Sequence, residues 1–316
     1  MAARRHKWGE RHYLEHATMM HPGGERKKRG KGVTVAGPLT GFASMRLVEL
    51  TPEAVQDWIS REAEQRPTRA RLALSLLHAF LRWCKDERAF ESLVSTDNPA
   101  GTRKAREALP KAKARSDVLE KQQLPAWFAA VCAMTNTTHA AYLQGLLLTG
   151  ARAGELRGLR WDEIDWRWRS LTVRDKDESK GGADGSRTIP LSPYVAHLLA
   201  SLPRRSPFVF AGATGEPLSR PNLAHAKACA VAGIEHLTLH GLRRSYATLS
   251  EWLEIPAGVT AQIQGHKASA VQERHYKKRP LDLLRVHHEK LEAWILEQAG
   301  VHFDAQATPG KLRAVT

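Results

Sequence analysis

The stretch LTLHGLRRSYATL, residues 237–249, places a histidine and two arginines beside apolar residues typical of a protein core. The pattern predicts a helix, on which His240 and Arg243 stand three positions apart and therefore project from the same side. A helix with a purely structural role keeps its arginines dispersed over the solvent-exposed face. The stretch thus indicates a binding site for an anionic group.

Three other short motifs add polar side chains next to small or apolar residues: Arg152 in TGARAGEL, His266 in QGHK and Tyr276 in RHYKKR. Arginine holds a phosphate through two parallel hydrogen bonds and stays charged. Two arginines can therefore clamp one phosphodiester and stabilise the added charge of a pentacoordinate transition state. Histidine can donate hydrogen bonds or move a proton. A tyrosine phenol becomes nucleophilic beside cationic groups and a base.

Each of these motifs alone has an ordinary structural explanation. TGARAGEL fits a turn between helices with a surface arginine, and a Gly-His pair fits the C-terminal cap of a helix. A lone tyrosine is usually a packed ring with a solvated hydroxyl, and a His-x-x-Arg pair arises freely by chance. The four motifs together, in this order, favour one shared site for phosphate chemistry.

In this combination the chain resembles the tyrosine recombinase (phage integrase) family, across residues 117–291. That family has an arginine in a TGxRxGEL box, then a hairpin lysine, HxLRR, GH and a tyrosine. The resemblance implies that Arg152 and Arg243 clamp the phosphate and that Tyr276 attacks it to form a 3′-phosphotyrosyl link. It also implies an acidic residue that supports the site and two histidines that help by hydrogen bonding or acid–base catalysis: Glu155, His240 and His266.

The family's lysine, which protonates the departing 5′ oxygen, lies in a hairpin loop before a strand that corresponds to RTIPL here. Lys180, in the loop ESKGGADG, fits this position best, and Lys176 is the alternative. The chain departs from the family pattern at Gln264, where leucine is common before the Gly-His pair. The second departure is the interval from His266 to Tyr276, which is within family variation but leaves His275 directly before Tyr276. Neither departure removes a residue that the chemistry needs.

The composition favours a polyanionic partner. The 316 residues include 48 Lys and Arg against 33 Asp and Glu, which gives a formal net charge of +15 and a sequence pI near 10.0. Nucleic acid is the first candidate and a membrane surface the second. No apolar run approaches the ~20 residues needed to cross a bilayer, and the first residues lack the apolar core of a secretory signal. We therefore expect a cytoplasmic protein without a membrane partner. The resemblance further implies a nucleoid-associated location and a bacterial or phage-encoded origin.

The sequence contains no pattern for a cofactor. It has no GxxxxGK[ST] phosphate loop and no carboxylates at metal-binding spacing. Three cysteines without CxxC pairing argue against a disulfide framework or a zinc ribbon: Cys84, Cys132 and Cys229. The chemistry implied by the resemblance needs neither metal nor nucleotide, because the phosphotyrosyl link conserves the energy of the broken phosphodiester.

The expected fold class is mainly α with a small β hairpin or sheet. Apolar periodicity predicts helices over residues 51–65 and 68–90, and two short strands around a glycine-containing turn predict the hairpin. By resemblance the architecture is a two-domain DNA clamp. Its expected parts are a basic arm with a helical core-binding domain, a basic linker, a catalytic domain and a C-terminal tail: residues 1–100, 101–116, 117–300 and 301–316.

The resemblance implies a site-specific recombinase that cleaves and rejoins duplex DNA and exchanges strands through a Holliday junction. Its expected partners are double-stranded recombination sites, three further copies of the chain on two duplexes, and accessory DNA-bending or directionality factors from the host or phage. Two alternatives share parts of this description: a type IB topoisomerase, and a DNA-binding regulator that has the fold but does not cleave. The DNA target sequence is not readable from such a fold.

Overall fold

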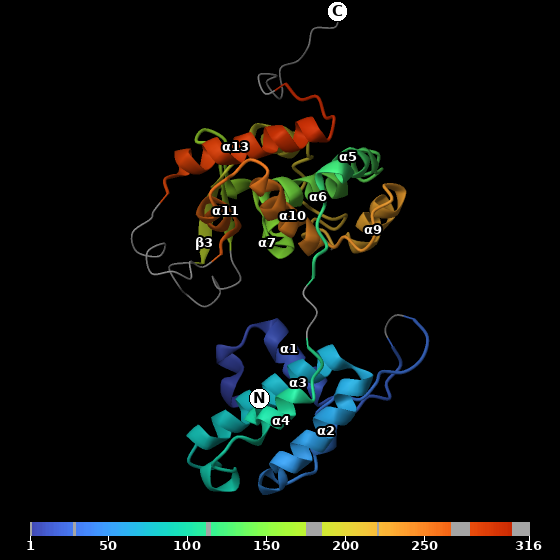
Figure 1. Ribbon diagram of the computed structural model, residues 1–316, viewed down its shortest axis with the longest axis vertical. Helices are drawn as coiled ribbons and strands as arrows, with labels where there is room; N and C mark the ends of the chain where they lie inside the picture. Colours follow the sequence, from blue (N-terminus) through green and yellow to red (C-terminus); the bar gives the residue numbers. More distant parts are fainter. Residues whose placement is uncertain are drawn as a thin grey trace, which may run out of the picture. The chain divides into compact units, whose positions relative to one another are not determined.

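The computed structural model describes residues 2–27, 30–111, 115–174, 185–219, 221–266 and 279–304. The chain divides into two compact units, unit 1 with residues 1–114 and unit 2 with residues 115–316 (Figure 1). Lys176, Lys180 and Tyr276 lie outside the described residues.

Unit 1 is helical and has its own apolar core. Thr51 begins the second helix by accepting a hydrogen bond from the backbone N–H of Ala54 (3.2 Å), and Pro52 occupies the first helical position. The α-helices of the unit are α1 (Glu10–Met19), α2 (Pro52–Gln65), α3 (Pro67–Asp86) and α4 (Arg103–Glu107). Short 3₁₀ helices span Ala2–Lys7, Thr40–Phe42, Leu47–Glu49, Glu91–Leu93 and Pro99–Gly101.

Two details of unit 1 differ from the sequence-based expectation. Helix α3 ends at Asp86, before residue 90, because Glu87 adopts an extended backbone conformation. The segment expected to be a linker contains helix α4, which Thr102 caps through its side chain. Ala105 of this helix is fully buried in the core of unit 1. The beginning of the predicted linker is therefore packed against the helices that precede it.

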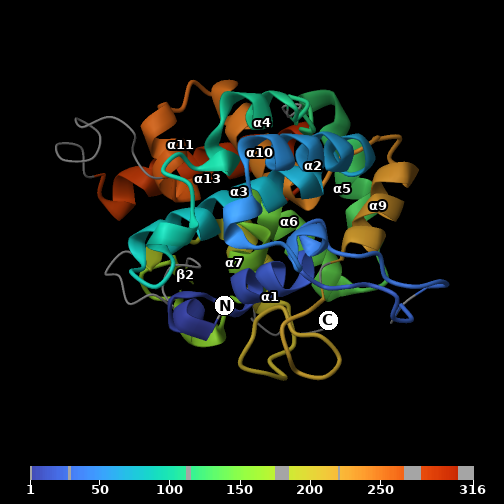
Figure 2. The same cartoon turned by 90° about the horizontal axis from the view of Figure 1, so that it is seen from below.

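Unit 2 is built around α6, on which every residue from Ala140 to Thr149 is buried. A helix that is apolar on all sides belongs in the centre of a unit, and α6 packs directly against α10. Figures 1 and 2 show α5 and α9 at one end of this unit and α11 with the sheet at the other. The α-helices in the described residues of this unit are α5 (Leu124–Cys132), α6 (Thr137–Thr149), α7 (Ala153–Arg157), α8 (Pro193–Ala200), α9 (Asn222–Val231), α10 (Leu239–Glu251), α11 (Ala257–Gln264) and α13 (Leu281–Gln298). Short 3₁₀ helices span Lys121–Gln123 and Trp161–Glu163.

A small antiparallel sheet with the order β1-β2-β3 completes unit 2. Its strands are β1 (Ile164–Asp165), β2 (Ser170–Arg174) and β3 (Ser186–Pro190). Leu171 faces Ile189 across the β2–β3 pair, and Val173 faces Arg187. Leu171, Val173 and Ile189 are buried, while β3 also packs against α13. A mainly helical chain with a small sheet is the fold class predicted above, which is thereby confirmed.

Gly150 ends α6 in a left-handed conformation that few other residues tolerate (φ 60°). A Cβ atom at this position would lie 2.8 Å from the ring of Tyr246. We expect Gly150→Ala to lower the free energy of unfolding by about 1–3 kcal/mol, because it adds backbone strain and overpacks the core. Chemical denaturation of the full chain measures this loss. Gly154→Ala is the control, since nothing lies within 4 Å of its Cβ position, and equal losses in both variants would contradict the explanation.

Candidate active site

The first turn of α10 is held in place by Asp117. Its Oδ2 atom accepts hydrogen bonds from the backbone N–H (3.0 Å) and the hydroxyl (2.6 Å) of Thr238, the residue that caps α10. Asp117 also pairs with Arg244. Burial would raise the pKa of Asp117, but the hydrogen bonds from Thr238 and the charge of Arg244 outweigh it and hold that pKa below its ordinary value. The chain entering unit 2 thus fixes the helical turn that carries His240.

Arg243 lies one turn further along α10 and is buried, with 4% of its surface exposed. One of its Nη1–H groups donates to the carbonyl of Gly150 (2.7 Å), directly after α6. The side-chain amide of Gln264 donates to the backbone carbonyl of Arg243 (2.7 Å). Gln264 is the position at which the sequence departs from the family pattern, and here its amide ties the end of α11 to α10.

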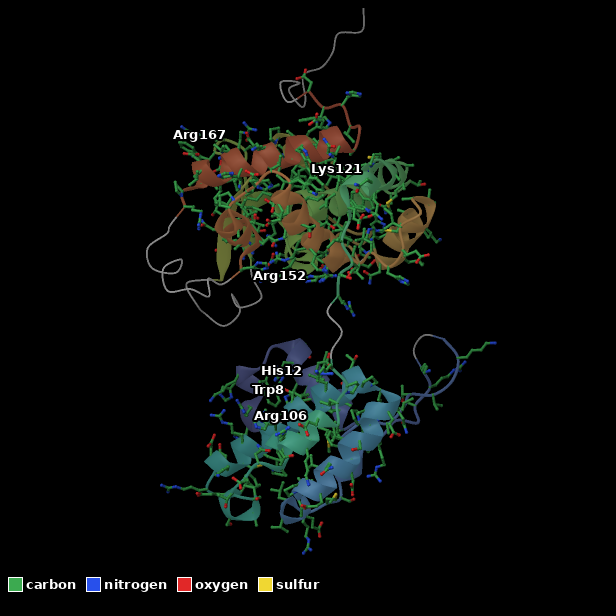
Figure 3. All side chains as sticks on the ribbon, viewed as in Figure 1. Trp8, His12, Arg106, Lys121, Arg152 and Arg167 are labelled. Atoms are coloured by element: carbon green, nitrogen blue, oxygen red, sulfur yellow. The ribbon has the colours of Figure 1, made fainter. Side chains whose placement is uncertain are left out.

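Arg152 and Glu155 form the start of α7, immediately after the left-handed turn at Gly150. The backbone N–H of Arg152 donates to Glu155 Oε2 (2.9 Å), and its Nη1 donates to Oε1 (2.5 Å). The Nη2 group reaches the carbonyl of Gly265 (3.2 Å), 113 residues away in sequence. The Glu155 side chain is 3% exposed and that of Arg152 is 33% exposed. The carboxylate is therefore buried beneath an arginine that stays open to solvent, on the side of unit 2 away from α13 (Figure 3).

His266 follows the C-terminal cap of α11. Gly265 adopts a left-handed conformation (φ 69°), and the backbone N–H of His266 then donates to the carbonyl of Ala261 (2.9 Å). This cap places the imidazole next to the arginines of the site. Burial lowers the pKa of His266, and the charges of Arg243 and Arg152 lower it further.

The second histidine, His240, also lies among positive charges that lower its pKa. Burial lowers its pKa, followed by the positive charges of Arg244 and Arg243, while Asp117 acts in the opposite direction. Each imidazole is therefore biased toward the neutral form near pH 7, in which one ring nitrogen donates a hydrogen bond and the other accepts. Two neutral histidines beside two arginines can bind several oxygens of one phosphate.

Arg187, on β3, is part of this cluster, and the sequence motifs did not single it out. Its Nη2 donates to Glu155 Oε2 (2.8 Å) and its Nε to the carbonyl of Ile263 (3.0 Å). Asp117 is a second residue that the motifs missed. For Arg187, the sequence analysis predicted the strand RTIPL that contains it. The sequence near Arg187 does not indicate that its hydrogen-bond partners are 32 and 76 residues away.

The structure brings together five of the predicted site residues, contributed by α7, α10 and the end of α11: Arg152, Glu155, His240, Arg243 and His266. Tyr276 and the two lysine candidates, Lys180 and Lys176, fall in stretches outside the described residues. Their places relative to the cluster stay predictions.

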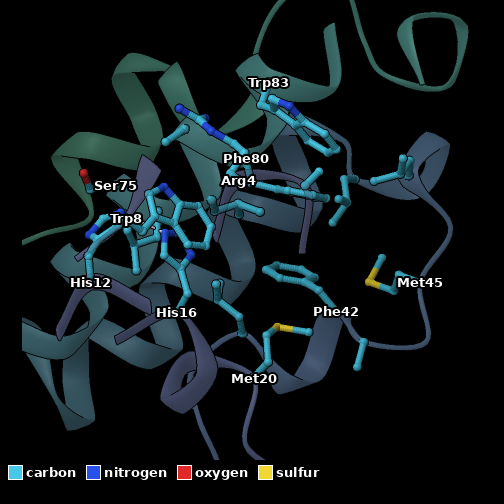
Figure 4. Close-up of a pocket in the computed structure, with 18 residues that line it drawn as sticks. Arg4, Trp8, His12, His16, Met20, Phe42, Met45, Ser75, Phe80 and Trp83 are labelled. Carbon is cyan, nitrogen blue, oxygen red and sulfur yellow. Dashed lines mark hydrogen bonds between the residues drawn. The ribbon is translucent and has the colours of Figure 1, made fainter. Parts of the chain in front are cut away.

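Other features of the described residues do not form a comparable site. In those ranges, no three His, Cys, Asp or Glu side chains gather where they could hold a metal ion. None of the described helices is long and apolar enough to cross a membrane. Unit 1 contains a pocket of about 540 Å³ lined mainly by apolar side chains, with Trp8 stacked on His16 (4.2 Å between ring centroids) (Figure 4). It lacks the convergent arginines of unit 2.

Comparison with known families identifies the chain. Residues 1–107 match the phage integrase core-binding domain, and residues 117–280 match the phage integrase family. The two matches describe an integrase catalytic domain preceded by a core-binding domain. The chain belongs to the phage integrase family, as the resemblance predicted.

Two integrases are similar in sequence to this chain over most of its length. Prophage integrase IntF of Escherichia coli (strain K12) is 42% identical over 303 residues, which cover 93% of this chain. The chain spans 64% of the length of that relative. The integrase of Streptomyces ambofaciens is 25% identical over 288 residues, covering 76% of this chain and 68% of its own length.

Solved structures support the fold. The Tn1549 transposon integrase in complex with transposon right end DNA has a TM-score of 0.63 at 16% identity, with 92% of this chain and 97% of that chain covered. A lambda integrase tetramer bound to a Holliday junction has a TM-score of 0.55 at 20% identity, with 74% and 68% covered. At these identities the likeness establishes the fold and not the reaction.

Proposed function

We propose that this chain is a site-specific tyrosine recombinase, an integrase that cleaves and rejoins duplex DNA through a 3′-phosphotyrosyl intermediate. The observation that carries the proposal is the convergence of Arg152 and Arg243 with two histidines, since Arg152 binds the Gly265 carbonyl and Arg243 the Gly150 carbonyl. A cluster of fixed cations and hydrogen-bond donors is suited to a phosphate that gains charge in its transition state.

In the proposed reaction the phenol oxygen of Tyr276 attacks the phosphorus of one DNA strand. A P–O bond to tyrosine forms, the bond to the 5′ oxygen breaks, and the phenol proton passes to a nearby base. Lys180, with Lys176 as the alternative, supplies the proton that the 5′ oxygen needs. Reversal of these steps with a different 5′ hydroxyl rejoins the strand, so the bond energy is retained and no cofactor is consumed.

Arg152 and Arg243 bind the non-bridging oxygens of this phosphate, while His240 and His266 donate further hydrogen bonds or shuttle the proton. Glu155 does not contact the phosphate. Its buried carboxylate accepts from the backbone and the side chain of Arg152. The guanidinium is held in position before DNA binds, which avoids the cost of ordering a long side chain during the reaction.

We further propose the partners that strand exchange requires. Four copies of the chain act on two duplexes and pass through a Holliday junction, in the cytoplasm and on the nucleoid, with accessory factors as further partners. Unit 1 serves as the core-binding domain. The net charge of +15 supports DNA binding dominated by phosphate neutralisation, which falls steeply with salt.

The proposal is tested with nicked suicide duplexes taken from DNA flanking the gene that encodes the chain. In buffer with a metal chelator, we expect a denaturation-resistant protein–DNA adduct that maps by peptide mass to the segment containing Tyr276. A two-duplex assay should then yield exchanged strands. Salt-sensitive binding without any adduct would instead indicate a DNA-binding regulator. Relaxation of supercoils without pairing of sites would indicate a topoisomerase.

Arg243→Lys is expected to slow cleavage of the suicide duplex by about 10²–10³-fold. Lysine keeps the charge but loses the planar fork that binds two phosphate oxygens at once. Single-turnover cleavage measures the loss. Arg285→Lys is the control, because Arg285 donates to the carbonyls of Trp168 and Arg169 at the other end of the sheet. Comparable losses in both variants would contradict a phosphate-binding role for Arg243.

A further inference from the structure

Arg187 links three segments of the candidate site. It lies on β3 and was not among the site residues that the sequence motifs indicated. Its side chain donates hydrogen bonds both to Glu155 at the start of α7 (2.8 Å) and to the Ile263 carbonyl near the end of α11 (3.0 Å). Its side chain is 15% exposed, against 3% for Glu155. The arginine is therefore held inside the site and is less open to solvent than Arg152.

Close packing fixes the path of the Arg187 side chain. A Cβ atom at Gly265 would lie 2.8–2.9 Å from Nη1, Cδ and Cζ of Arg187, so the guanidinium lies directly on the glycine that precedes His266. The carbonyl of the same glycine accepts a hydrogen bond from Arg152 (3.2 Å). The turn at Gly265 is thus contacted by both arginines.

Glu155 completes the arrangement because its two oxygens are shared between the same arginines. Oε1 accepts from Arg152 Nη1 (2.5 Å), and Oε2 accepts from the Arg152 backbone (2.9 Å) and from Arg187 Nη2 (2.8 Å). Burial would raise the pKa of Glu155, but the hydrogen bond and charge of Arg187, followed by those of Arg152, hold it below its ordinary value. The carboxylate stays ionised between two cations.

We infer that Arg187 is a positioning residue that sets the Arg152 guanidinium and the His266 imidazole at a fixed separation, and this inference rests on the proposed function above. It acts through Glu155 and the backbone of α11 and does not contact the phosphate. An arginine is required because a single side chain must donate in two directions, toward a carboxylate and toward a carbonyl, which a lysine ammonium cannot do with the same geometry.

The electrostatic consequence can be measured on the protein alone. Among the described residues, the charged and titratable groups that face His266 are contributed by α7, α10 and β3: Arg152, Arg243, His240 and Arg187. All of them, with burial as the largest cause, lower the pKa of His266. Removal of Arg187 should therefore raise that pKa, which NMR titration of the imidazole detects without DNA.

The test compares Arg187→Ala, Arg187→Lys and the control Arg174→Ala. Arg174 lies on β2 and pairs with Glu163, so the control also removes a strand arginine from a carboxylate. We expect Arg187→Ala to reduce single-turnover cleavage by about 10²-fold, a loss that misplacement of about 1 Å can cause, with DNA affinity unchanged. Arg187→Lys should restore the low pKa of His266 but little of the rate. Added guanidinium ion should recover part of the activity of Arg187→Ala.

Three outcomes would overturn the inference. The first is wild-type cleavage by Arg187→Ala with an unchanged His266 titration. The second is full recovery by lysine, which would reduce the role to charge. The third is a loss of cleavage rate and thermal stability in Arg174→Ala as large as the loss in Arg187→Ala. That result would mean that Arg187 contributes only to the general packing of the sheet. If the wild-type chain itself forms no adduct, the proposed function fails, whereas the His266 titration still decides whether Arg187 sits against that imidazole.

Discussion

Replacing Tyr276 with phenylalanine is expected to abolish the covalent protein–DNA adduct while leaving salt-sensitive DNA binding intact. The ring is retained and only the attacking oxygen is lost, so the reaction loses its nucleophile and no other step compensates. The measurement is adduct formation on the nicked suicide duplex, followed beside a binding titration of the same DNA. The expected loss is complete within the detection limit of the gel.

The remaining tyrosines of unit 2 are poor candidates for the nucleophile, because all three are buried. The hydroxyl of Tyr142 donates to the carbonyl of Ala153 (2.6 Å), and that of Tyr194 donates to Gln144 (2.7 Å). Burial raises the pKa of Tyr194 to about 12, and it also raises the pKa of Tyr246. A nucleophile needs access to DNA, which none of these three buried side chains has. It also needs a phenol that loses its proton easily, which Tyr194 and Tyr246 lack.

Tyr13 supplies the matched control, since it lies in unit 1 with Arg5 over its ring (4.5 Å to the centroid). Tyr13→Phe should form the adduct at the wild-type rate. A residual adduct in Tyr276→Phe would point to a different nucleophile, and His275 is the neighbour to examine. Acid treatment distinguishes a link to His275 from a link to another tyrosine, because a phosphohistidine link is acid-labile and a phosphotyrosine link is not. An acid-stable adduct in Tyr276→Phe would contradict the assignment.

The parts of the site that depend on local spacing are the parts that the sequence predicts. His240 and Arg243 share one side of α10 because they are three residues apart, and Arg152 meets Glu155 at the first turn of α7 for the same reason. The fold class follows similarly from helical periodicity and from one hairpin. In each case the decisive interaction spans only a few residues.

Long-range contacts are the parts that a single sequence does not reveal. Glu292 lies on α13, where a charged residue ordinarily indicates a solvated face. It is nevertheless 3% exposed and accepts hydrogen bonds from the backbone N–H groups of Tyr194 (2.8 Å) and Val195 (3.1 Å), which cap α8. Arg187 and Asp117 are comparable cases. Each has a polar partner far away in sequence, and only the packing of whole helices decides which partner that is.

Acidification is expected to destabilise unit 2 because it contains fully buried neutral histidines. His288, on α13, is 0% exposed and contacts the Leu148 carbonyl through Nε2 (2.9 Å). Within the described part of the chain, its Nδ1 has no hydrogen-bond partner. Burial lowers its pKa from 6.5 to about 4. His225 is similar, since burial also lowers its pKa to about 4. Between the unfolded-state pKa of 6.5 and the folded-state pKa of about 4, the unfolded chain therefore binds more protons than the folded chain.

Stability must then fall as the pH falls from about 6.5 toward 4, and the loss ends below the folded-state pKa. At about 1.4 kcal/mol for each pKa unit, each of these histidines contributes a loss of about 3 kcal/mol over this range. Urea denaturation of the full chain at a series of pH values measures the slope, with unit 2 followed through its own tryptophans.

His288→Gln separates this effect from general acid denaturation. Glutamine keeps a donor toward the Leu148 carbonyl but cannot take up a proton, so the variant should lose stability at neutral pH and show a flatter pH dependence below 6.5. His287→Gln is the control, since His287 is the preceding residue on α13 and is not fully buried. It should leave the slope unchanged. If His288→Gln and wild type show parallel curves, the titration of His288 is not what couples protons to the folding of unit 2.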